Sequence, residues 1–309
     1  MGRAIQFVYP QDTQVVSLSD GSCALGCDHC NKHYIEQMPT LRDQVKPNTT
    51  SYLISGGLKP DGKSFVLDKK KEIEAIKKKG NYRFNSHVGF VAPEELDAMA
   101  ELVDYVSFDF VSDAAVIKRV YHLDKTVDQY IAQFKLLRQK IEVYPHVTIG
   151  LDAGRIHWEY EAIDILNSLG ADRLVLNVLI PTPGTKFEKV PNPDLSEVTK
   201  VFRHARKTFS GDRLLILGCM RPSGAYRGEL DLMAVQEGVD RIVQPTPPAR
   251  KYAEEQGFDI SYFYECCALD AADNSRQTNE YQSPKEAVES GCCNTKPQTE
   301  VDSPFAVVD

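Results

Sequence analysis

Residues 146–180, HVTIGLDAGRIHWEYEAIDILNSLGADRLVLNVLI, contain one complete repeat of the chain's organisation. The run 146–152 is apolar and β-rich, residues 159–168 are amphipathic and of helical length, and 173–180 is a second apolar run. Neither run alternates strictly between polar and apolar residues, which is typical of strands covered on both faces. The stretch therefore predicts a strand–helix–strand unit of a parallel sheet.

The same alternation extends in both directions from this unit. Strands are expected at 13–19, 51–57, 82–88, 105–111, 146–152, 173–180, 213–219 and 240–246, with helices among them at 68–79, 93–102, 126–140, 159–168, 195–208 and 226–237. Eight such units predict an α/β fold, a closed (β/α)8 barrel of the TIM type, whose functional groups lie at the carboxyl ends of the strands. An open, partial (β/α)6 barrel with a C-terminal extension is the alternative.

A change of composition near Leu269 predicts where the barrel ends. Residues 258–267 could form one more extended segment, and the sequence beyond them is polar and poor in aliphatic residues. We therefore expect one barrel domain, 1–267, and a polar tail, 268–309, that is mobile unless a partner or metal orders it. Two tail cysteines, Cys292 and Cys293, are expected to be ordinary tail residues rather than ligands.

The charge balance and hydropathy exclude two classes of partner. A net charge of −8 argues against a nucleic-acid-binding protein, and no apolar run approaches the roughly 20 residues that span a membrane. Residues 1–12 lack the features of a secretory signal, so a cytoplasmic protein with reduced cysteines is expected. The basic segment Lys69–Gly80 predicts a solvated surface helix, with a docking patch for an acidic partner as the alternative.

Three of the eight cysteines follow the first expected strand with the spacing C-x3-C-x2-C, at Cys23, Cys27 and Cys30. A [4Fe–4S] cluster has four irons, so three thiolates leave one iron open for a small molecule. A zinc site completed by His29, His33 or a distant cysteine is the alternative from spacing alone.

This loop resembles the signature of the radical S-adenosylmethionine (SAM) enzymes. The resemblance implies that the open iron binds SAM, with His29 near the adenine, and that the cluster receives electrons from a donor such as ferredoxin or flavodoxin. Ser55, Gly56 and Gly57 resemble the glycine-rich segment that meets the methionine amino group. Residues 180–185, IPTPGT, resemble the PxPGT turn of the biotin synthase-like branch, which implies that the backbone of Ile180 and Pro181 flanks the adenine.

Polar side chains also lie near the ends of further expected strands: Asn85, His87, Asp109, Asp152, Arg155 and Asn177. Hydrogen-bonded core or rim residues are the alternative at each position. The family resemblance implies SAM contacts for Asn85, His87 and Asn177. It implies a catalytic, substrate-facing position for Asp109 and substrate contacts for Asp152 and Arg155.

A second group of cysteines points to the reaction. Cys219 ends the seventh expected strand, and Cys266 and Cys267 follow the barrel, so the three could hold an auxiliary [4Fe–4S] cluster. One of them could instead be a substrate-facing thiol, or Cys219 a buried small side chain and the doublet incidental.

Several segments resemble the subunits of bipartite, archaeal-type lipoyl synthases: LISGG, NSHVGF, the stretch from YVSFDF to VYHLDKTVDQY, PHVTIGLDAG, VLIPTPGTKF and LGCMRPSG. This resemblance implies sulfur insertion into an octanoyl chain carried by an acidic protein domain, together with a paralogous radical SAM subunit. A radical SAM enzyme for methylation, rearrangement or cofactor assembly remains an alternative, as does a non-catalytic metal-binding protein.

Overall fold

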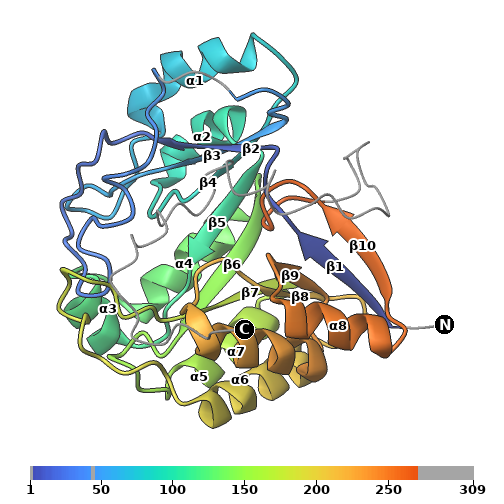
Figure 1. Cartoon of the computed structure of the whole chain (residues 1–309). Helices are drawn as coiled ribbons and strands as arrows, with labels where there is room; N and C mark the ends of the chain where they lie inside the picture. Colours follow the sequence, from blue (N-terminus) through green and yellow to red (C-terminus); the bar gives the residue numbers. More distant parts are fainter. Residues whose placement is uncertain (1–2, 43–45, 271–309) are drawn as a thin grey trace.

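The computed structural model describes residues 3–42 and 46–270, which form one curled parallel sheet with helices on its outside (Figure 1). The sheet has ten strands in the order β10-β1-β9-β8-β7-β6-β5-β4-β3-β2, and every neighbouring pair is parallel. The strands are β1 (Ala4–Val8), β2 (Thr13–Ser17), β3 (Ser51–Ser55), β4 (Arg83–Ser86), β5 (Tyr105–Asp109), β6 (Glu142–Ile149), β7 (Arg173–Val178), β8 (Leu214–Leu217), β9 (Arg241–Val243) and β10 (Asp259–Phe263).

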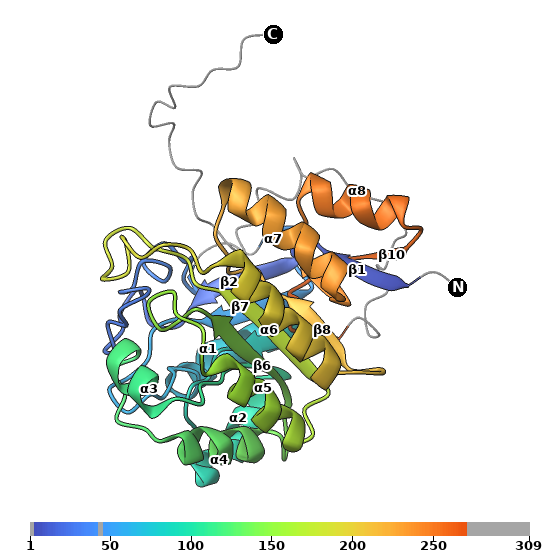
Figure 2. The same cartoon turned by 90° about the horizontal axis from the view of Figure 1, so that it is seen from below.

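The helices cover the convex face of this sheet (Figures 1 and 2). They are α1 (Lys70–Lys77), α2 (Leu96–Leu102), α3 (Ala114–Val120), α4 (Val127–Leu137), α5 (Glu159–Ser168), α6 (Leu195–Thr208), α7 (Gly224–Glu237) and α8 (Pro247–Glu255), with 3-10 turns at Leu67–Lys69 and Pro93–Glu95. In α6, residues 198, 201, 202 and 205 are buried, which is the spacing of a single apolar stripe. Within the described ranges, no helix combines the length and apolarity required to cross a membrane.

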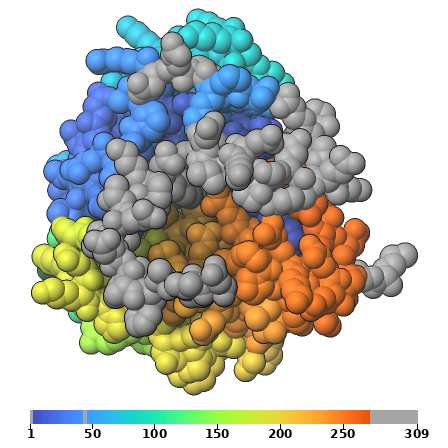
Figure 3. Space-filling model, in the orientation of Figure 1, coloured from blue at the N-terminus to red at the C-terminus, as the bar shows by residue number. Residues whose placement is uncertain are grey.

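The α/β barrel class is confirmed, and all eight expected strands are present. The closed eight-stranded form is wrong, because β1 and β10 extend the sheet beyond β9 and no strand pairing joins β10 to β2. The open, partial barrel with a C-terminal extension fits the observed sheet. In the space-filling view, dark blue atoms of the N-terminal part lie among the orange atoms of the C-terminal part, as the pairing of β1 with β9 and β10 requires (Figure 3).

The segment after β10 closes the amino-terminal end of the barrel. Its backbone meets the start of β2, where Asp12 N donates to Tyr264 O and Cys266 N donates to Thr13 Oγ1, each at 2.8 Å. Arg241, the first residue of β9, donates to the carbonyls of Cys267 and Leu269 at 2.6 and 2.9 Å. The segment therefore forms the floor of the barrel interior.

The boundary between barrel and tail at residue 267 stays a prediction. On the tail side of that boundary, Ala268 and Leu269 are fully buried in the floor. Residues 271–309, with Cys292 and Cys293, lie outside the described residues.

Candidate active site

The first cysteine loop follows β2 at the carboxyl edge of the sheet, as the barrel fold predicts. The ligand atoms of Cys27, His29 and Cys30 all lie within 4.8 Å of one another. Cys23 lies beside this group, and its Sγ accepts a hydrogen bond from Leu58 N at 3.4 Å. His33, considered as a zinc ligand from sequence, is outside the group and packs edge-on against Tyr34. The loop thus brings together thiols of the kind that bind iron or zinc.

The two close thiols, Cys27 and Cys30, differ in acidity. A hydrogen bond from Cys27 outweighs the effect of burial and, with the help of His29, lowers the pKa of Cys30 to about 4. The same hydrogen bond, together with burial, raises the pKa of Cys27. Cys30 therefore favours the thiolate form, which is the form that ligates metal.

The glycine pair after β3 is required by the cysteine loop itself. A Cβ at Gly57 would lie 1.9 Å from the carbonyl oxygen of Ser22 and 2.5 Å from Cβ of Cys23. Gly57 N also donates to Ser19 Oγ at 2.8 Å. Close backbone approach explains this glycine, while the SAM contacts of Ser55, Gly56 and Gly57 stay predictions.

Residues that the sequence did not single out hold the cysteine loop in place. Asp28 is buried, and its Oδ1 lies 2.7 Å from both His122 Nε2 and Lys186 Nζ. His122 also donates from Nδ1 to the carbonyl of Leu25 at 2.9 Å. The thiol of Cys27 contacts the carbonyl of Tyr121 at 3.8 Å. These contacts join the loop to the segment that follows α3.

The turn at 180–185 lies against the same loop. Tyr34 Oη lies 2.6 Å from Thr182 Oγ1, and Asn31 Nδ2 donates to the carbonyl of Gly184 at 3.4 Å. Ile180 and Pro181 therefore belong to a segment in contact with the cysteine loop. Their contact with adenine stays a prediction.

Polar side chains from β4, β5 and β6 meet inside the barrel near its carboxyl edge. His87 Nδ1 lies 3.6 Å from Asp109 Oδ2, and the rings of His87 and His146 are 5.5 Å apart. Deeper in the barrel, Asn85 Nδ2 donates to Ser107 Oγ at 3.0 Å. The sequence predicted Asn85, His87 and Asp109 as site residues but missed His146 and Ser107.

The pKa values of His87 and His146 are shifted in opposite directions. Burial opposes the charged form of His87, but the hydrogen bond and charge of Asp109 outweigh burial and raise the pKa of His87. Burial also opposes the charged form of Asp109, and His87 and His146 outweigh it, so the pKa of Asp109 is lowered. Burial and the nearby charge of His87 lower the pKa of His146 to about 4. The site thus combines a His87–Asp109 pair, whose charged form each partner favours in the other, with the neutral imidazole of His146.

On the next strand, β7, Asn177 is 6% exposed, and its Oδ1 has no hydrogen-bond partner among the described residues. A Cβ at Gly218 would lie 2.1 Å from this oxygen, so Gly218 makes room for it. A buried acceptor without a donor is costly and indicates a position for a ligand or water. The predicted contact between Asn177 and SAM is compatible with this arrangement.

Asp152 and Arg155 lie together after β6, but Asp152 does not present a free carboxylate. It is 3% exposed, and Arg119, Arg155 and His157 surround it. Burial opposes its ionisation, yet hydrogen bonds from these three side chains lower the pKa of Asp152. The arginines, rather than Asp152, are the groups available to a substrate.

In the second group of cysteines, Cys266 and Cys267 lie in the floor of the barrel interior, whereas Cys219 follows β8. Cys266 and Cys267 are buried among apolar side chains, and the partly buried Cys219 packs against the same cluster. Cys266 Sγ accepts a hydrogen bond from Asn85 Nδ2 at 3.5 Å. Among the described residues, only Cys27, His29 and Cys30 bring three ligand atoms within 4.8 Å of one another. The second cluster therefore stays a prediction.

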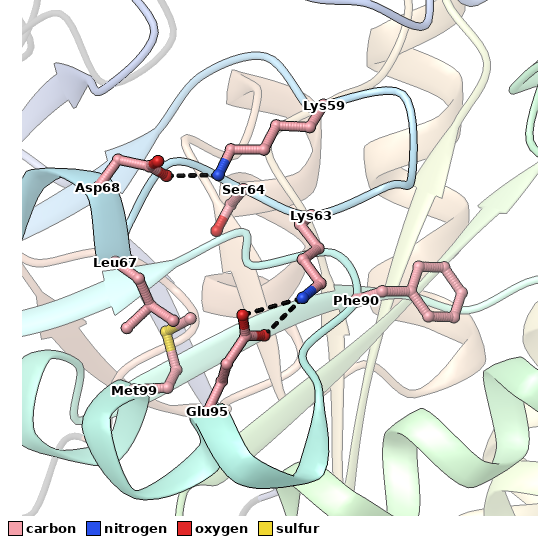
Figure 4. Close-up of a pocket in the computed structure, with 8 residues that line it drawn as sticks. All are labelled: Lys59, Lys63, Ser64, Leu67, Asp68, Phe90, Glu95 and Met99. Atoms are coloured by element: carbon pink, nitrogen blue, oxygen red, sulfur yellow. Dashed lines mark hydrogen bonds and ion pairs between the residues drawn. The ribbon is translucent and has the colours of Figure 1, made fainter.

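Two cavities lie outside this polar interior. One of about 220 Å³ is lined by Lys59, Lys63, Ser64, Leu67, Asp68, Phe90, Glu95 and Met99. Figure 4 shows that its lysines point to carboxylates, Lys59 to Asp68 and Lys63 to Glu95, so both charges are already paired. The other, about 460 Å³, lies between residues 154–157 and the start of α6. Neither cavity contains a predicted cluster ligand.

The basic helix α1 lies on the outer wall of the barrel (Figure 1). Lys69 and Lys70 pair with Glu72, Glu74 and Glu101, and Lys77 donates to the carbonyl of Glu101 at 2.7 Å. These contacts are those of a solvated surface helix. Its role as a docking patch stays a prediction.

Comparisons with known proteins agree on the fold. No family model and no curated protein sequence matches the chain. The crystal structure of HydG, a maturase of the [FeFe]-hydrogenase, matches 84% of this chain at 14% identity with a TM-score of 0.57. The structure of methylornithine synthase (PylB) matches 93% of this chain and 81% of PylB, at 12% identity with a TM-score of 0.53. The chain spans 64% of the HydG chain, slightly less than two thirds.

Proposed function

We propose that this chain is a radical SAM enzyme whose Cys23, Cys27 and Cys30 hold a [4Fe–4S] cluster. The observation that carries the proposal is the cysteine loop, in which Cys27, His29 and Cys30 converge within 4.8 Å at the carboxyl edge of a partial parallel barrel. Three thiolates suit a cluster with one iron open to a further ligand. The fold shared with HydG and PylB supports the same proposal.

The groups around the loop suit a bound cofactor and substrate. With SAM bound, the cluster would supply the electron for homolysis, yielding a radical that abstracts hydrogen from an unactivated C–H bond. Asn177 of β7 offers an unpartnered acceptor. On the neighbouring strands, the His87–Asp109 pair and the neutral His146 offer a donor and acceptors to polar atoms of the bound molecules. The chain thus supplies binding and orientation.

The proposal is tested by iron content and SAM cleavage. After anaerobic reconstitution with iron and sulfide, the triple variant Cys23→Ala, Cys27→Ala and Cys30→Ala should lose about four irons per chain. It should also form no 5′-deoxyadenosine with SAM and dithionite. Wild-type protein that forms none under the same conditions would favour the non-catalytic metal-binding alternative, and cleavage retained in the triple variant would reject the assignment.

We further propose that the reaction is sulfur insertion into a protein-bound octanoyl chain, as in lipoyl synthesis. The presence of Cys219, Cys266 and Cys267 in one interior cluster below the first cysteine loop supports an auxiliary [4Fe–4S] cluster there. The proposal includes a paralogous radical SAM subunit, an acidic carrier domain, and ferredoxin or flavodoxin as electron donor. Wild-type protein should then contain about eight irons, falling to about four in Cys266→Ala.

The alternative is a radical SAM enzyme with one cluster, for methylation, rearrangement or cofactor assembly. One observation favours it: Cys219, Cys266 and Cys267 do not bring three ligand atoms within 4.8 Å in the described chain. Four irons in wild type and no loss in Cys266→Ala would select this alternative.

A further inference from the structure

Two arginines from different elements share one buried carboxylate at the carboxyl edge of the barrel. Arg119, in the last turn of α3, and Arg155, in the loop after β6, both pair with Asp152, and Arg155 Nη2 lies 2.8 Å from Oδ2. His157 Nε2 lies 3.0 Å from the same oxygen. The carboxylate of Asp152 is thus paired with three side chains of this chain.

The backbone of this loop fixes the arrangement. Gly150, Ala153 and Gly154 have φ of +76°, +52° and +86°, which makes a sharp turn, and Asp152 and Arg155 form an isolated antiparallel bridge across it. The buried Glu159 accepts hydrogen bonds from Gly150 N at 2.7 Å and His157 N at 2.8 Å. The loop is therefore fixed from both ends.

The two guanidinium groups remain accessible. The side chains of Arg119 and Arg155 are 50% and 68% exposed, whereas that of Asp152 is 4% exposed. Two like charges held together repel each other, and one carboxylate offsets only one of them. Three other acidic groups lie nearby, and each already has a partner. Asp113 lies 3.7 Å from His157 and accepts a hydrogen bond from Val116 N as the cap of α3. In the wall of the cavity beside Arg155, Asp194 caps α6 by accepting from Ser196 N and Glu197 N, and Glu197 pairs with Lys200 at 2.6 Å. Outward N–H groups on two fixed guanidiniums suit a carboxylate.

This pair adjoins the candidate cluster site. Arg119 is two residues before Tyr121, whose carbonyl contacts the Cys27 thiol at 3.8 Å and whose ring packs edge-on against His29 at 5.3 Å. Arg155 and His157 also line the cavity of about 460 Å³, which leaves room for a ligand beside Arg155.

We propose that Arg119 and Arg155 bind a carboxylate of the substrate, with Asp152 and His157 as positioning residues. The inference rests on the proposed radical SAM function with an octanoyl substrate. The carboxylate has two possible sources, a free fatty acid or an acidic side chain of the carrier beside the modified lysine. Both sources present the same chemistry to the two guanidiniums.

The test measures binding by calorimetry with two matched ligand pairs. The first pair is octanoate and octanamide, and the second is an octanoyl-lysyl peptide with glutamate beside the lysine and the same peptide with glutamine. The proteins are wild type, Arg119→Gln, Arg155→Gln and, as a control with the same charge change, Lys135→Gln on the exposed side of α4. Thermal unfolding checks that each variant is folded.

Wild type and Lys135→Gln should bind the charged member of at least one pair about tenfold more tightly, and each arginine variant should lose this preference. A preference for octanoate assigns the site to a free acid, and one for the glutamate peptide assigns it to the carrier. Absence of any preference in wild type, or its retention in both arginine variants, would overturn the proposal. SAM cleavage, measured separately, should persist in the arginine variants; its absence from wild type would refute the proposed function without affecting the binding result.

Discussion

Asp109 and His87 form an ion pair inside the barrel, with 3.6 Å between Oδ2 and Nδ1, although they come from neighbouring strands and not from one motif. His146, the register partner of Asp109 on β6, completes the group from the third strand. Its Nδ1 lies 2.8 Å from the carbonyl of Tyr144, which can only accept, so the neutral ring keeps its lone pair on Nε2. One group therefore contains two imidazoles whose pKa values are shifted in opposite directions, that of His87 raised and that of His146 lowered to about 4.

The ion pair predicts a defined pH dependence. The raised pKa of His87 contributes stability below its ordinary value of 6.5, and this contribution is lost as the pH rises through the raised value. The lowered pKa of Asp109 contributes above its ordinary value of 3.8 and is lost as the pH falls. The stability difference between wild type and Asp109→Asn should therefore be largest between pH 3.8 and 6.5.

NMR titration of the histidine ring protons should also show a lower pKa for His87 in Asp109→Asn. Asp164→Asn removes a carboxylate from a second aspartate–histidine pair, 2.7 Å from His204 on the outer surface, and should leave His87 unchanged. Equal His87 titration in wild type and Asp109→Asn would show that the pair is not formed in solution.

The close approach of Gly57 to the cysteine loop predicts that Gly57→Ala is damaging. The added Cβ would overlap the Ser22 carbonyl and Cys23, neither of which is the end of a flexible side chain. We expect a loss of about 1–3 kcal/mol of stability and a lower iron content after reconstitution. Gly228→Ala, within α7 and with no atom within 4 Å of the added Cβ, is the matched control and should be neutral or stabilising. Normal iron content in Gly57→Ala would mean that the loop can move away.

The sequence predicted the strands that can be recognised from neighbouring residues in the chain, but not a strand whose role depends on distant partners. Each of the eight expected strands is a short apolar run, and each except the first is followed by a helix, so the pattern is local. The strand β1 was missed because only residues 9–12 separate it from β2, without a helix, and its partners β9 and β10 are more than 200 residues away. The sheet consequently acquires an edge at β10 that the strand count did not predict.

In the candidate site, too, the sequence predicted what a local pattern shows and missed contacts between distant residues. The spacing of the first three cysteines predicted a metal-binding loop, and the group at Cys27, His29 and Cys30 has the geometry of one. The contact between Asp28 and His122 joins residues 94 positions apart, and neither residue has a distinctive local pattern. His146 lies in an otherwise apolar strand, where a lone histidine is indistinguishable from a core residue. Only the strand register places it beside Asp109.

The buried ion pair Arg221–Asp231 predicts a large effect on stability. Both side chains are fully buried, their atoms lie 2.7 and 3.2 Å apart in a two-pronged contact, and Asp231 also accepts from Thr246 N at 2.9 Å. Asp231→Ala leaves a buried guanidinium without its counter-ion and should cost about 3–5 kcal/mol in urea unfolding. Glu255→Ala, which breaks the exposed pair with Lys251, should change stability by less than about 0.5 kcal/mol. A small effect of Asp231→Ala would indicate that water reaches Arg221.

Asp28 is expected to act on the cluster loop through its two cations, because it directly follows Cys27 and lies 2.7 Å from both His122 and Lys186. Asp28→Asn keeps the size of the side chain but removes the charge that attracts His122 and Lys186 to the loop. We expect the variant to remain folded but to retain less iron during dialysis against a chelator, measured by iron analysis and visible absorption. Asp164→Asn, which removes the carboxylate of the exposed pair with His204, should retain iron like wild type. Equal iron retention by Asp28→Asn and wild type would show that backbone contacts alone, such as Cys30 N to Cys27 O at 3.2 Å, hold the loop.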